Sequence, residues 1–150
     1  FKEFYDEIPF TPTKIRSNRY YYENDFYSYT DGIFLYSMIR KMRPKNIIEI
    51  GSGFSSALML DVNHQFFANN INLTFIEPFT ERLDSLLKRE DFKSTQIIAK
   101  PIQKIDFKIF DELKDGDFLF IDSTHVLKTG SDLQFIFNKI IKIYFSNFFS

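Results

Sequence analysis

The chain has 150 residues, with 19 Lys and Arg against 20 Asp and Glu and a formal net charge of −1. This length suits one domain with a substantial core, and the near-neutral balance provides no basic surface for nucleic acid or an anionic membrane. The absence of cysteine excludes disulfides, a Cys-ligated zinc and a thiolate nucleophile. No apolar run is long enough to cross a bilayer, and the polar N-terminus does not resemble a signal peptide. We therefore expect a cytoplasmic protein without nucleic-acid or membrane partners.

Residues 1–30 are rich in tyrosine and charged side chains and show no regular apolar period. They predict an irregular N-terminal segment, followed by the main domain over residues 31–150. The aromatic residues of this segment, the run Tyr20–Tyr22 and Phe26, could cover a ligand as a lid. Such residues more often belong to a core or to an interface, and the interface of a homodimer is one alternative.

From Asp31 the apolar residues fall at helical spacing, which predicts a helix with Asp31 as its N-cap and Pro44 after its end. Four short apolar runs then predict buried strands: Asn46–Ile50, Leu73–Ile76, Gln96–Ala99 and Phe118–Ile121. Helical patterns lie between the strands: Ser56–Phe67, Thr80–Leu87 and, more weakly, Phe107–Leu113.

The alternation of strands and helices predicts an α/β fold with right-handed crossovers. We expect a Rossmann-like, mostly parallel sheet in strand order 3-2-1-4, covered by helices on both faces. A last helix is expected to begin near Ser131. Because a doubly wound sheet normally continues with further βα units, we expect the later strands to be missing or degenerate and the domain to be shortened at its C-terminus.

The first predicted strand runs into the Gly51-Ser52-Gly53 loop and then into a helix, as in chains that turn around a nucleotide-like ligand. Gly51 allows a turn that a residue with Cβ resists, and Gly53 allows the backbone to touch a ligand. Glu49, just before the loop, suits a cationic ligand group better than a phosphate. Glu77, at the tip of the next strand, can accept two hydrogen bonds from a ribose diol. Its alternative is a solvated acid or a charge in the first turn of the following helix.

These residues distinguish between two cofactors. A dinucleotide site requires Gly-x-Gly-x-x-Gly, but Ser56 stands at the third glycine position, which weakens an NAD(P) interpretation. S-Adenosylmethionine has no phosphate. It offers an ammonium to Glu49, directly or through water, a carboxylate to the backbone N–H groups after Gly51, and a ribose to Glu77. The pattern therefore favours S-adenosylmethionine as the cofactor.

Three segments together resemble motifs I, II and IV of a class I S-adenosylmethionine-dependent methyltransferase: Glu49-Ile50-Gly51-Ser52-Gly53, Phe75-Ile76-Glu77-Pro78 and Phe118-Leu119-Phe120-Ile121-Asp122-Ser123-Thr124-His125. Within that family the chain resembles the small-molecule and sugar O-methyltransferase-like proteins. The resemblance implies that the methionine end of the cofactor is lined by Glu49, Gly51, Ser52, Gly53 and Ser55. It also implies that Glu77 binds the ribose, that the adenine lies near Ile102 and Gln103, and that the cofactor contacts Asp122 and Ser123.

Asp122 and His125 are the candidates for catalysis. Methyl transfer to a hydroxyl requires an aligned acceptor and a group that takes its proton. His125 could be that base, or a loop histidine bonded to the backbone, and Asp122 could hold the methionine end of the cofactor or a divalent metal. We predict no metal site, because the second acid that related magnesium-dependent enzymes add from the next strand is missing. Asp132 is better explained as a charge in the first turn of a helix.

The sequence thus predicts an S-adenosylmethionine-dependent methyltransferase that acts on a small-molecule acceptor, with O-methylation favoured. Two alternatives stay open. One is a non-catalytic, methyltransferase-like remnant or assembly module. The other, less favoured, is an NAD(P)-dependent oxidoreductase.

Overall fold

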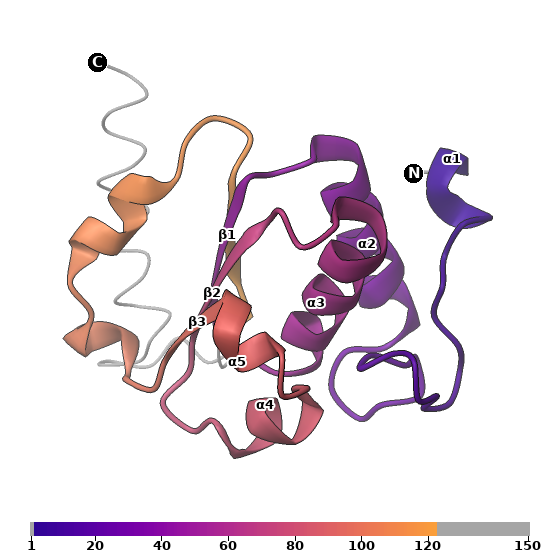
Figure 1. The fold of residues 1–150 in the computed structure, drawn as a ribbon, viewed down its shortest axis with the longest axis horizontal. Helices are drawn as coiled ribbons and strands as arrows, with labels where there is room; N and C mark the ends of the chain where they lie inside the picture. The colour runs from indigo at the N-terminus through magenta and orange to yellow at the C-terminus, as the bar shows by residue number, and fades with distance from the viewer. Residues whose placement is uncertain (1, 123–150) are drawn as a thin grey trace.

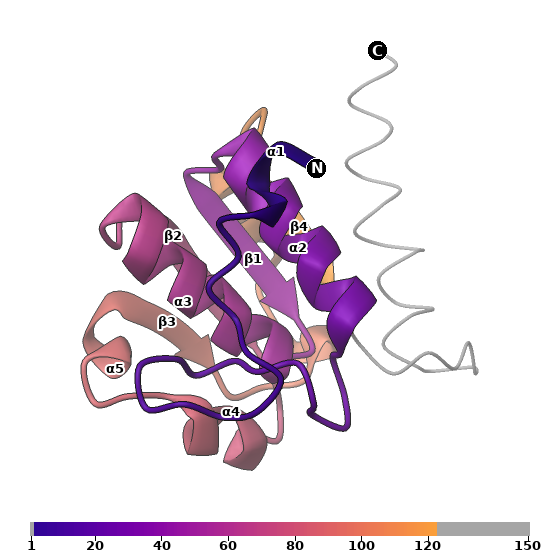
Figure 2. The ribbon, with the colours of Figure 1, turned by 90° about the vertical axis from the view of Figure 1, so that its right-hand side faces the viewer.

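The structure, a computed structural model, describes residues 2–122 of the chain (Figure 1; Figure 2). Its central feature is a four-stranded parallel sheet in the order β3-β2-β1-β4. The strands are β1 (Asn46–Ile50), β2 (Asn72–Ile76), β3 (Thr95–Ile98) and β4 (Phe118–Ile121). Ile47 of β1 pairs with Leu73 of β2 on one side and with Phe118 of β4 on the other. The expected α/β fold and the strand order 3-2-1-4 are therefore confirmed.

Helices cover both faces of the sheet (Figure 1). One face packs against three helices: α2 (Tyr29–Met42), α3 (Phe54–Phe67) and α4 (Glu81–Leu86). The opposite face packs against two short 3-10 helices: η1 (Ile102–Lys104) and η2 (Phe107–Glu112). Two further short helices complete the described part of the chain: α1 (Lys2–Tyr5) and α5 (Asp91–Ser94). Within residues 2–122, no helix combines the length and the apolar character that crossing a bilayer requires.

The side chains of β1 alternate between the two layers. Ile47 belongs to the core formed with α2 and α3, whereas Ile48 and Ile50 pack with Ile102 on the face of the 3-10 helices. Because successive side chains of a strand point to opposite faces, Glu49 shares the face of Ile47. This alternation directs the Glu49 carboxyl toward the first turn of α3.

The structure moves the predicted starts of two helices. α2 begins at Tyr29, earlier than the expected N-cap Asp31. α3 begins at Phe54 rather than at Ser56, because Gly53 ends the loop and its N–H group is capped by the Ser56 hydroxyl. Capping of this kind satisfies one of the N–H groups that a helix leaves without an internal partner.

Other boundaries differ by less or lie beyond the described residues. The weak helical pattern at Phe107–Leu113 forms the 3-10 helix η2, and β3 begins at Thr95 rather than at Gln96. The short helices α1, α5 and η1 were not predicted, since segments of three or four residues carry no periodicity. The helix expected near Ser131 and the question of later strands lie outside residues 2–122.

The N-terminal segment packs as part of the core. Tyr20 is fully buried, and its ring meets that of Phe10 edge-on with 4.9 Å between the centroids. The Tyr20 hydroxyl donates a hydrogen bond to the carbonyl of Tyr27 at 2.8 Å. This approach requires Gly32 of α2, since a Cβ there would lie 2.2 Å from the Tyr20 hydroxyl oxygen. Of the aromatics considered as a lid, Tyr20 is thus a core side chain, whereas Phe26 is exposed.

Candidate functional site

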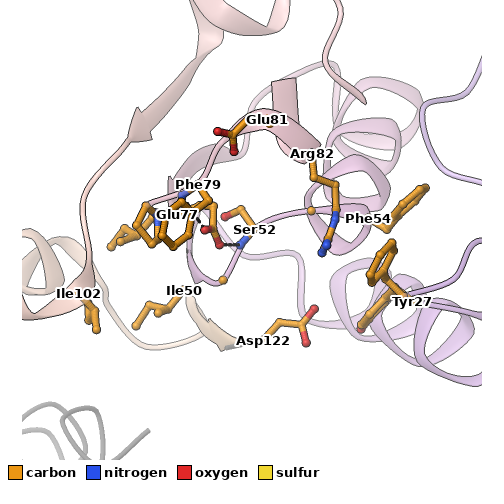
Figure 3. A pocket seen from close by; sticks show the side chains of 15 residues that line it. Tyr27, Ile50, Ser52, Phe54, Glu77, Phe79, Glu81, Arg82, Ile102 and Asp122 are labelled. Atoms are coloured by element: carbon orange, nitrogen blue, oxygen red, sulfur yellow. Dashed lines mark hydrogen bonds between the residues drawn. The ribbon is translucent and has the colours of Figure 1, made fainter. Parts of the chain in front are cut away.

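A cavity of about 510 Å³ opens at the carboxyl ends of β1, β2 and β4 (Figure 3). In an open parallel sheet, ligands bind at this edge, next to the strand where the order reverses. The cavity brings together six of the predicted site residues: Gly51, Ser52, Gly53, Glu77, Ile102 and Asp122. The topology of the sheet alone therefore collects residues from four separate segments of the chain.

The backbone N–H groups of the loop are already hydrogen-bonded. The Gly51 N–H donates to the last carbonyl of β2 at 3.0 Å, the Ser52 N–H to Glu77 Oε2 at 3.2 Å, and the Gly53 N–H to Ser56 Oγ at 2.9 Å. Gly51 has a φ of 86°, in the left-handed region that a residue with Cβ resists. The expected turn is present. However, the Ser52 and Gly53 N–H groups, which were expected to bind a ligand carboxylate, are used within the protein.

Glu77 is held at the cavity wall through both of its carboxylate oxygens. Oε2 accepts from the Ser52 N–H, and Oε1 accepts from the Phe79 N–H at 2.9 Å. Figure 3 shows the carboxylate beside Ser52. Because each carboxylate oxygen has more than one lone pair, Glu77 can accept further hydrogen bonds from a ligand. Its remaining lone pairs are therefore able to accept from hydroxyl groups of a ligand.

The Glu49 carboxyl lies behind the loop and is fully buried, with 0% of the residue exposed. It accepts hydrogen bonds from Ser55 Oγ at 2.5 Å and from Ser56 Oγ. Burial raises the pKa of Glu49 to about 8, although the hydroxyls of Ser55, Ser56 and Ser52 oppose the rise. The Ser52 hydroxyl contributes to this effect on the Glu49 pKa, although it does not meet the geometry of a hydrogen bond. This corrects the expected position: Glu49 and Ser55 do not line the cavity, so Glu49 cannot contact a ligand ammonium directly.

Ser55 connects this buried acid to the cavity. Its Oγ lies 2.5 Å from Glu49 Oε1 and 3.2 Å from Asp122 Oδ2. A serine hydroxyl has one hydrogen to donate, so both contacts are hydrogen bonds only when one of the two carboxyl groups carries a proton. The raised pKa of Glu49 favours Glu49 as the protonated group. Asp122 then faces the cavity as the charged partner.

An aromatic wall closes one end of the cavity. Phe26 and Tyr27 of the N-terminal segment line it together with Phe54 of α3. The rings of Phe26 and Phe54 are stacked, with centroids 6.0 Å apart and an interplanar angle of 17°. The guanidinium of Arg82 lies 3.6 Å from the Phe26 centroid. Sequence reasoning named Phe26 but missed Tyr27 and Arg82, because no local pattern links α4 to a ring of the N-terminal segment.

The remaining predicted residues are placed differently. Gln103 is exposed and does not line the cavity, whereas its neighbour Ile102 is buried and does. Ser123, His125 and Asp132 lie outside the described residues, so their roles stay predictions. Within residues 2–122, no cluster of three or more His, Cys, Asp or Glu side chains is placed to hold a metal ion.

Comparison with known proteins adds one relative. No family model and no solved structure matches the chain. A protein of Archaeoglobus fulgidus, described as uncharacterized, is 32% identical over 112 residues. This similarity covers 73% of the chain and 49% of the archaeal protein, so the chain spans about half the length of this relative. The relative's description names no activity.

Proposed function

We propose that this chain is an S-adenosylmethionine-dependent methyltransferase domain that acts on a small-molecule acceptor, with a hydroxyl favoured as the methyl acceptor. The observation that carries the proposal is the pairing of the loop with Glu77. Glu77 is fixed at the tip of β2 and faces the cavity, while the loop N–H groups that would bind a phosphate are used within the protein. This arrangement supports a ligand that has a ribose but no phosphate.

Apolar surface lies beside the proposed ribose position. Phe79 follows Glu77 closely in the chain and is 75% exposed, and the buried Ile102 contributes to the same cavity. A flat, aromatic base such as adenine buries its faces against side chains of this kind. The volume of about 510 Å³ lies within the range of roughly 300–1,000 Å³ that is typical of small-molecule sites.

A dinucleotide is supported less well. In dinucleotide sites the pyrophosphate binds free N–H groups at the start of the helix after the glycine loop. Here the Gly53 N–H donates to Ser56, the residue at the third glycine position. Glu49 disfavours a dinucleotide relative to S-adenosylmethionine less than expected, because a protonated carboxyl does not repel a phosphate. The occupied N–H groups carry the argument instead.

When bound, S-adenosylmethionine would supply a methyl group on a sulfonium; the acceptor oxygen would bond to the methyl carbon as the carbon–sulfur bond breaks, with S-adenosylhomocysteine as the leaving group. The residues of the chain have to align the acceptor, exclude water and take the proton that the acceptor hydroxyl loses. Burial raises the pKa of Tyr27, so this phenol on the cavity wall stays neutral and can donate a hydrogen bond. His125 remains the proposed base, and Asp122 is proposed to orient the cofactor.

Isothermal titration calorimetry with S-adenosylmethionine and S-adenosylhomocysteine tests this proposal. We expect saturable binding to the wild-type protein, and a loss of roughly 1–3 kcal/mol in Glu77→Ala through the missing charge-assisted hydrogen bonds. Glu112→Ala, an exposed position at the end of η2, is the matched control and should bind like the wild type. Folded protein that gives no heat at millimolar ligand, or that binds NADH instead, would overturn the proposal.

A further inference from the structure

An amino-acid group in the cavity needs partners for a carboxylate and an ammonium, and the glycine loop supplies neither. The Ser52 and Gly53 N–H groups donate to Glu77 and Ser56, and Glu49 is enclosed behind the loop. The proposed cofactor ends in such a group. Its two charges therefore have to be met by other side chains of the cavity wall.

We propose that Arg82 and Asp122 form a subsite for an α-amino-acid group, in which Arg82 binds the carboxylate and Asp122 binds the ammonium. The inference rests on the proposed function, because the methionine end of the cofactor is the group that would occupy the subsite. It gives a binding role to Arg82, which belongs to none of the three sequence motifs.

Arg82 is held over the start of α3 and is available for a ligand. Its guanidinium carbon lies 3.6 Å from the Phe26 centroid, and its Cδ would lie 3.4 Å from a Cβ built on Gly53. Stacking on an aromatic face orients a guanidinium while its N–H donors stay free at the edge of the plane. Within residues 2–122, no ion pair involves Arg82. The fork of donors suits a carboxylate, which it can bind through two parallel hydrogen bonds.

Asp122 stands on the opposite side of the same cavity. Its N–H donates to the Ile50 carbonyl at 2.8 Å, which fixes the backbone beside the end of β1. In Figure 3 the carboxylate of Asp122 and the guanidinium of Arg82 point toward each other across the cavity. The carboxylate and the ammonium of an amino acid are attached to one carbon atom. A cation and an anion that face each other at one end of a cavity match this pair of charges.

The test compares two ligands that differ in the chain on sulfur. S-Adenosylhomocysteine carries a chain that ends in the α-amino-acid group, whereas 5′-methylthioadenosine carries a methyl group there and has no such charges. We expect Arg82→Met to weaken S-adenosylhomocysteine roughly 10- to 100-fold and to leave 5′-methylthioadenosine unchanged in calorimetric titrations. Arg82→Lys keeps the charge but not the fork, so its loss should be smaller and again confined to S-adenosylhomocysteine. Arg89→Met, at an exposed position outside the cavity, is the matched control.

The possible outcomes separate the two proposals. If the folded wild-type protein binds neither ligand, the proposed function and the subsite both fail. If it binds both, but Arg82→Met weakens them equally or not at all, the subsite is overturned while the proposed function stands. Arg82 is exposed, so the variant should fold. Should it not, Arg82→Lys takes its place, and an equal effect on both ligands in that variant likewise rejects the subsite.

Discussion

Helix α3 contacts two buried acids, Glu49 at its first turn and its own Asp61 farther along, and they are compensated in different ways. The two residues are 0% and 1% exposed. Asp61 is bonded to a cation, the guanidinium of Arg19. Glu49 is bonded to the hydroxyls of Ser55 and Ser56. Asp61 therefore ties segments of the fold together, whereas Glu49 retains a proton beside the cavity.

Arg19 is the centre of a cluster that it forms with Asp61 and Asp91. Its Nη1 donates to Asp61 at 2.8 Å, while Nε and Nη2 donate to Asp91 of α5 at 2.7 and 2.6 Å. Burial opposes the charge of Arg19, but the bonds to Asp91 and Asp61 outweigh it and raise its pKa. Burial also raises the pKa of Asp61. However, Asp61 accepts hydrogen bonds from two backbone N–H groups as well as from Arg19, and these bonds favour its charged form. The guanidinium partner does not lose its proton in proteins. The cluster is therefore an ion pair that anchors the N-terminal segment.

Within residues 2–122, the side-chain hydrogen bonds to Glu49 come from hydroxyl groups and not from a cation. Hydroxyl donors stabilise a buried carboxylate less than a guanidinium does, and the charge of Asp122 raises the pKa of Glu49 further. The acid is therefore neutral over a wide range of pH. The same helix thus uses one acid for anchoring and keeps another in a state that can change its charge near the site.

The largest expected effect comes from removing the cation of the cluster of Arg19, Asp61 and Asp91. Arg19→Met should lower the free energy of unfolding by about 3–5 kcal/mol, because Asp61 and Asp91 are left buried without the cation that compensates their charge. Urea denaturation followed by circular dichroism measures this loss. Arg16→Met, an exposed position in the same segment, should stay within about 0.5 kcal/mol of the wild type. Equal midpoints for the two variants would show that the cluster does not anchor the segment.

The second effect is the pH dependence that Glu49 contributes. Its pKa is raised from 4.5 to about 8 on folding, so the folded state binds more protons between these values and stability is lost as the pH rises through this window. The slope should reach up to about 1.4 kcal/mol per pH unit. Glu49→Gln, which stays neutral, should remove this slope and leave stability near pH 5 almost unchanged. If wild type and variant show parallel pH profiles in thermal denaturation, Glu49 is ionised in the folded state.

The smallest effect tests the hydroxyls themselves. Ser55→Ala removes the hydroxyl that lies 2.5 Å from Glu49 and should cost about 1 kcal/mol at pH 6. This hydroxyl donates to Glu49 once the acid is ionised and thereby lowers its pKa, so its loss should raise that pKa and extend the decline of stability to higher pH. The same denaturation series measures both changes, with the exposed Ser17→Ala as control. A decline that moves to lower pH would contradict the assigned direction of the hydrogen bond.

Much of the fold was predictable from local pattern. β1 and β4 begin and end where their apolar runs do, because parallel strands covered on both faces read as continuous apolar segments. The strand order 3-2-1-4 was expected for a doubly wound, Rossmann-like sheet, and it was confirmed. The start of α3 was missed, since it depends on the cap that Ser56 gives to Gly53 rather than on the spacing of apolar residues. Short helices such as α5 were missed because they form under tertiary contacts.

The sequence by itself determined that a glycine loop, Glu77 and Asp122 end three neighbouring parallel strands, because strand topology collects such residues at one edge of the sheet. Only the tertiary structure decided that Glu49 lies behind the loop and that Arg82 rests on Phe26 above it. The physical reason is that burial, hydrogen bonding and ring stacking depend on residues far apart in the chain. A sequence pattern records which groups are present near a site, whereas the packing around them determines which are charged, which are already bonded and which can still bind a ligand.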